Sequence, residues 1–172
     1  MALEGTTGKR KIHSAAAFLL VFASTPLTAN AVASAAEELR GVREFTINVE
    51  SLDEHAMKCA ISTQGIETAA RFTLQQSKVL LRPPGSPKPN TFLYYNVNVI
   101  SLPSGQCLYS FSLDAQLLGE LKVGTRVNFG AYTAWHKGGI RSTFHANAAS
   151  TLGYDIEAVT KSFVAAWSEV NP

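Results

Sequence analysis

The chain has 172 residues, 15 basic and 13 acidic side chains, and a formal net charge of +2. Proteins that bind nucleic acids draw much of their affinity from phosphate contacts and are expected to carry a clustered basic face. No cluster of Lys or Arg follows Lys11, so the charge pattern argues against nucleic acid as a partner.

The first 35 residues have the layout of a secretory signal peptide. Lys9, Arg10 and Lys11 precede an uncharged apolar run of nine residues, 15–23, and Pro26 ends this run. A membrane anchor is the alternative, but crossing a bilayer takes about 20 apolar residues. Small residues then recur at every second position over 29–35. This is the pattern at which signal peptides are cleaved, so we predict cleavage between residues 31 and 35.

Cleavage changes the charge of the remaining chain, because Glu4 and three basic residues leave with the signal. It takes three of the 15 basic and one of the 13 acidic residues, so twelve of each remain. Residues 36–172 are then nearly neutral and numerous enough to bury a core as one domain. We expect an exported protein, periplasmic or secreted, without a membrane span after cleavage.

Cys59 and Cys107 are the two cysteines of the chain. An isolated pair in an oxidising compartment usually forms a disulfide, so we predict a Cys59–Cys107 bridge. The alternative is a redox or metal site in which His55 and Cys59, four residues apart, share a helix face. Two ligands do not make a metal site and the C-x-x-C spacing is absent, so we expect neither a metal nor a cofactor.

The first third of residues 36–172 predicts a strand followed by a helix in two parts. Apolar residues alternate with polar ones over 45–49, which is the period of a half-buried strand. Ser51 and Glu54 have the spacing of a capping box and predict that a helix begins there. The helix is expected to break at 59–62 and to resume over 63–76.

Polar turns separate the strands that follow. A short strand is predicted over 78–82, and the loop 83–90, with its four prolines, is interpreted as a stiff connector rather than a ligand for an aromatic groove. Alternation predicts a long antiparallel hairpin over 93–117, with its turn at 103–105. The remaining predictions are a turn at 119–125 and a strand over 127–135, ended by Gly138 and Gly139.

The last element is a helix, because apolar residues recur at spacings of three and four from Leu152 to Val170. The element order is then β-α-β-β-β-β-α. This order predicts a two-layer α+β sandwich, in which a mostly antiparallel sheet of about five strands has helices packed on one face.

The polar face of this sheet is the expected binding surface. Hydroxyls, amides and aromatic rings suit a hydrated ligand, such as a glycan or an envelope protein, and a bare edge could accept a partner strand. The alternative is an ordinary solvated face. The candidate binding residues are Tyr94, Asn96, Asn98, Ser110, Ser112 and Tyr132, with Asp114 and Asn128 beside them.

Catalytic motifs are absent from the sequence: there is no G-x-S-x-G, no H-E-x-x-H, no P-loop and no dinucleotide fingerprint. The weak catalytic candidates are His136 and Asp114, with His145 nearby, as an acid/base pair. We therefore expect a non-enzymatic binding or accessory protein of the cell envelope. A small periplasmic hydrolase that uses His136 with Asp114 is the alternative.

Four segments carry a resemblance to a known group: LRGVREFTINVESLDEHAMKCAIS, FLYYNVNVIS, TAWHKGG and FVAAWSEVNP. They resemble small exported bacterial proteins, common in soil proteobacteria, that mostly have no assigned activity. The resemblance implies export and supplies no catalytic residue. In length and exported character the chain is also similar to a nodulation-efficiency protein of root-nodule bacteria, which implies an effect on host association. Its element order is similar to periplasmic accessory domains of the anticodon-binding-like type.

Overall fold

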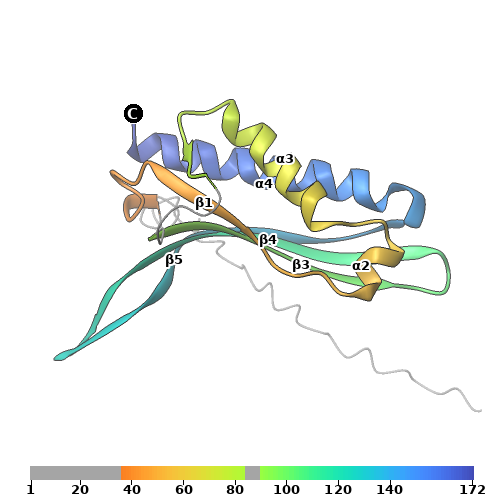
Figure 1. Cartoon of the computed structure of the whole chain (residues 1–172), viewed down its shortest axis with the longest axis horizontal. Coiled ribbons are helices and arrows are strands. Elements are labelled where there is room, and N and C mark those ends of the chain that lie inside the picture. Colours follow the sequence, from red (N-terminus) through yellow and green to blue (C-terminus); the bar gives the residue numbers. More distant parts are fainter. Residues whose placement is uncertain (1–35, 84–89) are drawn as a thin grey trace, which may run out of the picture.

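Two layers make up the fold of this protein. The computed structural model describes residues 36–83 and 90–172, and for 121–123 only the backbone. Five strands form one sheet, and the two longer helices lie side by side across one of its faces (Figure 1). The predicted α+β class, with helices packed on one face of a five-stranded sheet, is confirmed. The predicted signal peptide, 1–35, and most of the proline-rich loop lie outside the described residues.

The sheet is mixed, with strand order β2-β1-β3-β4-β5. Strand β1 pairs in parallel with both of its neighbours, whereas β3, β4 and β5 are antiparallel. The parallel pairing of β1 with β2 follows from the helical crossover between them. The strands are β1 (Glu44–Val49), β2 (Leu80–Leu81), β3 (Thr91–Ser101), β4 (Gln106–Val123) and β5 (Arg126–Phe144).

The helices are α2 (Glu54–Lys58), α3 (Thr63–Gln75) and α4 (His145–Val170). The predicted break between α2 and α3 is confirmed. The prediction that Ser51 caps the N-terminus of the first helix is wrong. Asp53 caps α2 by accepting a hydrogen bond from the Ala56 amide at 3.1 Å, because the helix begins one residue after Asp53. Within residues 36–83 and 90–172, no helix combines the length and the apolar character needed to cross a membrane.

The β4–β5 hairpin is longer than the sequence suggested. The predicted turn at 119–125 is wrong, because β4 continues to Val123 and the chain reverses at Gly124, whose φ of +62° favours glycine. The outer part of this hairpin projects beyond the helix layer (Figure 1). Val127 and Phe129 in this part are exposed.

Gly138 and Gly139 do not end β5, although the sequence predicted that they would. Gly138 pairs with Ser112 and Gly139 with Phe111, and the strand continues to Phe144. A Cβ atom at Gly138 would lie 2.4 Å from the carbonyl oxygen of Phe111. Glycine therefore permits close approach of two backbones here rather than a turn.

A β-bulge reverses the alternation within β5. Ala115 pairs with Trp135 but Gln116 pairs with Thr133, so Ala134 is an extra residue, and Ala134 and Trp135 are both buried. Tyr132 therefore pairs with buried Leu117 and packs against the hydrophobic core. The prediction that Tyr132 shares the polar face is wrong, because a single inserted residue exchanges the two faces of a strand.

The core lies between the sheet and the helix layer. Phe163 of α4 packs edge-on against Phe45 of β1 and Trp135 of β5, with ring centroids 5.3 and 5.6 Å apart. The Trp167 Nε1–H donates to the carbonyl oxygen of Val42 at 2.6 Å. Because α4 contributes residues along its whole length, it is the main cover of the sheet.

Two tyrosine hydroxyls enter this core and find partners on α4. The hydroxyls of Tyr95 and Thr160 are 2.9 Å apart, and that of Thr160 also donates to the Ile156 carbonyl. The Tyr109 hydroxyl donates to a carboxylate oxygen of Asp155 at 2.8 Å. A buried polar group without such a partner would be costly, so these pairs fix how α4 sits on the sheet.

Alkaline solution should destabilise the fold through these tyrosines. Burial raises the pKa of Tyr95 and of Tyr109 above the ordinary value of 10.0. A pKa that is higher in the folded than in the unfolded chain contributes stability below pH 10 that is lost as the pH rises further. We expect the urea-unfolding free energy to fall between about pH 9 and about pH 11, and to fall less in Tyr95→Phe. Equal decreases in the two proteins would contradict this prediction.

At neutral pH, Tyr95→Phe should lower the free energy of unfolding by about 1 kcal/mol, because the substitution removes one buried hydrogen bond.

Candidate functional site

The face of the sheet turned away from the helices, here the open face, is the candidate site. In β3 the side chains of Leu93, Tyr95, Val97 and Val99 are buried beneath the helices. Successive side chains of a strand point to opposite faces, so the residues between them lie on the open face. Both long helices lie on the other side of the sheet (Figure 1).

Five of the six predicted binding residues lie side by side on the open face. Three cross-strand pairs of β3 and β4 form the centre: Tyr94 with Asp114, Asn96 with Ser112, and Asn98 with Ser110. We call these six residues, together with Glu50 and His136, the polar centre. Strand alternation predicted that the six residues of these pairs share one face, and the register confirms that they are neighbours. Their role in binding stays a prediction.

Hydrogen bonds link the polar centre to the end of β1. Asn98 Nδ2 donates to Asn96 Oδ1 at 2.6 Å, and Asn96 Nδ2 donates to the Glu50 carboxylate. Glu50 was not among the predicted residues, although it continues the alternation of β1. Burial, followed by a hydrogen bond with Glu50 and by the charges of Glu50 and Asp114, raises the pKa of Tyr94. The centre therefore offers amides, hydroxyls and two carboxylates.

His136 and Asp114, the catalytic candidates, are paired across β4 and β5. Nδ1 of His136 lies 2.5 Å from Oδ1 of Asp114, and the two side chains are 61% and 19% exposed. Asp114 can hold the imidazole with Nε2 directed outward, the arrangement of a general base and its orienting carboxylate. The sequence suggested a histidine beside a turn, but the residue lies within a strand because β5 continues through the two glycines.

Hollows in the surface lie away from this pair. One of about 680 Å³ lies against α3 and includes Phe72, and one of about 410 Å³ lies beside β2 and includes Arg82. Neither is lined by His136 or Asp114. With 61% of its side chain exposed, His136 is open to water, whereas catalytic groups usually act in a concave site that excludes water.

One end of the open face carries exposed apolar side chains, which we call the apolar end. Ile100, Leu108, Ile140 and Phe144 are 52%, 37%, 77% and 61% exposed. Ile100 is opposite Leu108, and Leu108 is diagonal to both Ile140 and Phe144, so the four are neighbours on one surface. The sequence did not predict this cluster, because the last strand was expected to end before Ile140, whereas β5 continues to Phe144.

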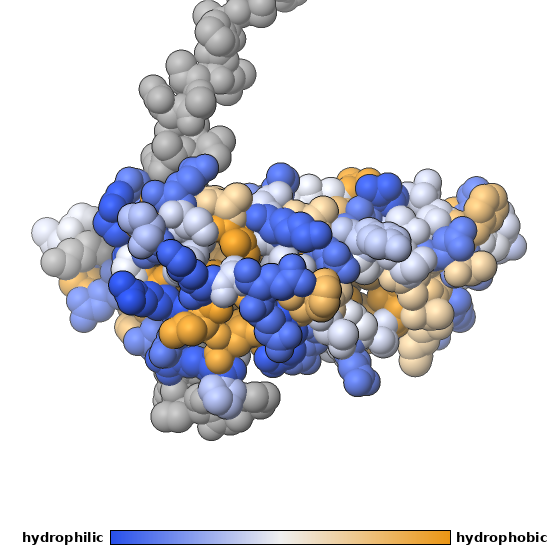
Figure 2. Space-filling model, turned by 90° about the horizontal axis from the view of Figure 1, so that it is seen from above, coloured by the Kyte–Doolittle hydropathy of each residue, from blue (hydrophilic) through white to orange (hydrophobic). Residues whose placement is uncertain are grey.

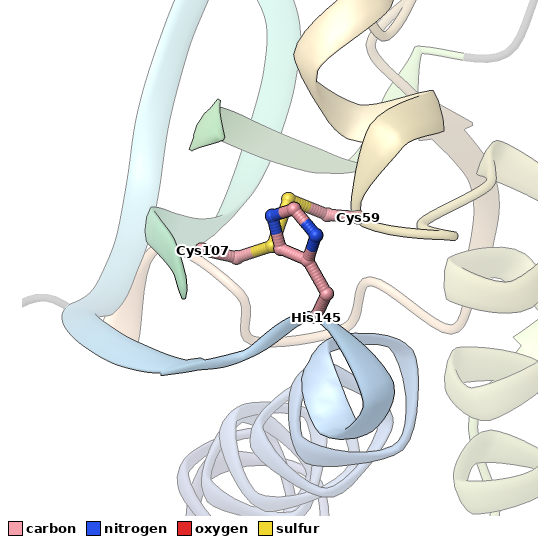
Figure 3. A group of neighbouring side chains, drawn as sticks. All are labelled: Cys59, Cys107 and His145. Atoms are coloured by element: carbon pink, nitrogen blue, oxygen red, sulfur yellow. A yellow bond between two sulfur atoms is a disulfide. The ribbon is translucent and has the colours of Figure 1, made fainter. Parts of the chain in front are cut away.

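The predicted disulfide is confirmed, between Cys59 at the C-terminus of α2 and Cys107 in β4. His55 does not complete the alternative site, since its Nδ1 accepts a 3.4 Å hydrogen bond from the Ser101 amide. The neighbouring imidazole is that of His145, the first residue of α4 (Figure 3). A disulfide of this kind fits an extracytoplasmic protein.

The helix layer offers a different surface. Seen from above, hydrophilic residues alternate with several apolar patches, one of them at the lower left (Figure 2). Its exposed large side chains include Met57, Phe72 and Tyr154, which belong to three different helices. Exposed apolar residues are normal on a protein surface, but those of the apolar end are four neighbours that lie directly beside the polar centre.

Comparisons with known proteins do not identify the chain. No protein-family model matches it, and no curated protein does. Among solved structures, it is similar to a minor lipoprotein from Acinetobacter baumannii, with 11% sequence identity and a TM-score of 0.37 over 74% of this chain and 91% of that chain. A likeness of this size transfers neither a fold nor a function.

Proposed function

We propose that this chain is an exported, non-enzymatic binding or accessory protein of the bacterial cell envelope, and that its binding surface is the open face. The observation that carries the proposal is that the apolar end and the polar centre lie next to each other on that face. The apolar end supplies area that gains free energy when it leaves water, and the polar centre beside it supplies directed hydrogen bonds. A protein partner with an apolar patch next to polar groups fits this pattern.

Export is supported by the leader-like sequence and by the disulfide. The resemblance to small exported proteins of soil bacteria points the same way. Under this proposal the polar centre selects the partner, because an unpaired carboxylate or amide would be costly in any other interface. Any effect on host association would be a consequence of that binding.

The experiment is in-cell cross-linking of the full, C-terminally tagged chain, followed by identification of the attached protein. We expect one dominant envelope partner, whose yield falls about tenfold or more in Asn96→Lys and in Ile140→Asp. Ile140→Asp places a charge that would be desolvated without a counterion. Asn96→Lys replaces an amide that bonds Asn98 and Glu50 with a longer, charged side chain, which changes both the shape and the hydrogen bonding of the polar centre. Met57→Asp is the matched control for Ile140→Asp, since the two side chains are 73% and 77% exposed.

Equal cross-linking of all these variants would contradict the open face as the binding surface. The amount of folded protein in each variant is checked first by far-ultraviolet circular dichroism. A strictly monomeric chain that retains no envelope component would contradict the binding function itself.

A hydrolase is the second candidate function, and the hydrogen bond between His136 and Asp114 favours it. If the pair is catalytic, His136→Ala should abolish turnover of small esters or amides and leave partner binding intact. If the pair only recognises a partner, the full chain should show no turnover and His136→Ala should weaken binding. The same variant therefore distinguishes the two functions.

A further inference from the structure

Three metal-ligating side chains meet at the end of the molecule where α2, β4 and α4 come together. The sulfur atoms of Cys59 and Cys107 and an imidazole nitrogen of His145 all lie within 4.8 Å of one another (Figure 3). Ligand atoms around tetrahedral Zn²⁺ are about 3.5 Å apart, as its bond lengths of about 2.0 to 2.3 Å require. Small side-chain rotations are therefore enough to place these three atoms around one ion once the sulfurs are not joined.

We propose that, while its cysteines are still thiols, the chain binds one Zn²⁺ ion through Cys59, Cys107 and His145. Each thiol releases one proton when its sulfur bonds to the ion, and the imidazole binds as the neutral base. A water molecule takes the fourth position. Later, a disulfide-donating oxidant takes two electrons from the two thiolate sulfurs, which join as the Cys59–Cys107 bond while the ion leaves. The oxidant's own disulfide becomes two thiols with two protons from solvent.

The surroundings suit a metal more than a reactive thiol. Cys59 and Cys107 are both fully buried, and burial disfavours the free thiolate that makes a cysteine reactive. His145 is half-buried and gives a small ion a way in from solvent. Two buried thiolates would be costly alone, and a divalent cation compensates their charge.

Ser101 holds the histidine of this site in place. Its Oγ lies 3.2 Å from Nε2 of His145, and its amide donates to Nδ1 of His55. Partners of this kind orient a metal-binding imidazole. The metal would join three elements distant in sequence, α2, β4 and α4, of which the disulfide joins the first two, so the ion can hold the fold together before oxidation.

The experiment uses the full chain, reduced with a phosphine and titrated anaerobically with Co²⁺ as a spectroscopic probe, then with Zn²⁺. We expect one Co²⁺ per chain with thiolate-to-metal absorption, its displacement by Zn²⁺, and no binding by the oxidised chain. His145→Ala should weaken Zn²⁺ binding about tenfold or more, and Ser101→Ala should weaken it less. His136→Ala, which removes an exposed histidine elsewhere, is the matched control.

A reduced chain that is unfolded without metal does not obscure the result. In that case Zn²⁺ should restore the helical circular dichroism signal of the unaltered chain and of His136→Ala, but not that of His145→Ala. Zinc should also slow oxidation of the two thiols. Absence of thiolate-to-metal absorption, or equal affinity in His145→Ala and His136→Ala, would overturn the proposal.

Discussion

Removal of the Cys59–Cys107 bridge is expected to lower the free energy of unfolding by about 4 kcal/mol in Cys59→Ala/Cys107→Ala. The two cysteines are 48 residues apart in sequence. Joining them restricts the unfolded chain, and the loop-entropy relation gives about 4 kcal/mol for a loop of that length. Urea unfolding of the oxidised chain and of the double variant, in buffer containing a chelator, measures the difference.

The bridge also fastens α2 to the sheet, since it joins the end of that short helix to β4. Loss of the bridge should therefore increase amide exchange first in α2. Met57→Ala, an exposed substitution two positions from Cys59, serves as control and should change stability by less than about 0.5 kcal/mol. Equal stability of the double variant and the unaltered chain would contradict the prediction.

Replacement of Asp155 by Ala is expected to cost about 3 kcal/mol. This carboxylate is buried on α4, where it accepts the Tyr109 hydroxyl at 2.8 Å and pairs with Arg141 at 2.8 Å. Its removal leaves the buried Tyr109 hydroxyl without its acceptor. Arg141 is 53% exposed and can turn to water, so most of the cost comes from the tyrosine.

Urea unfolding at neutral pH measures this loss of stability. Two further variants test whether it comes from the hydrogen bond between Tyr109 and Asp155. Asp155→Asn keeps an oxygen acceptor for the hydroxyl and should cost less than Asp155→Ala. In Tyr109→Phe the hydroxyl is absent, so adding Asp155→Ala should cost less than it does in the unaltered chain. Strict additivity of the two substitutions would show that they do not interact.

Local sequence patterns predicted the regular elements well because each reflects a short-range physical cause. Alternation in 93–99 and 107–117 gave the central hairpin, and spacings of three and four gave α4. The break between α2 and α3 was also correct. The exact cap was not, since Ser51 and Asp53 both suit that role and only the position where the helix begins distinguishes them.

Most of the polar centre could be predicted from the sequence in the same way, whereas the apolar end could not. Tyr94, Asn96 and Asn98 fall on one face of β3 by alternation alone. Tyr132 was misplaced, because the bulge at Ala134 leaves no clear sign in composition or spacing. Ile140 and Phe144 were missed because two adjacent glycines usually indicate a turn, whereas here they allow two strands to approach closely.

The sequence by itself determined the type of the main elements, the α+β class and the cysteine pairing, because backbone periodicity and the presence of only two cysteines constrain them locally. Only the tertiary structure decided which side chains became neighbours. His136 is hydrogen-bonded to Asp114, Ile140 is a cross-strand neighbour of Leu108, and the His145 imidazole lies beside the two cysteine sulfurs. Each of these pairs joins segments that are distant in sequence. Those contacts depend on strand register and on how α4 packs, which arise from the free energy of the whole core rather than from any one segment.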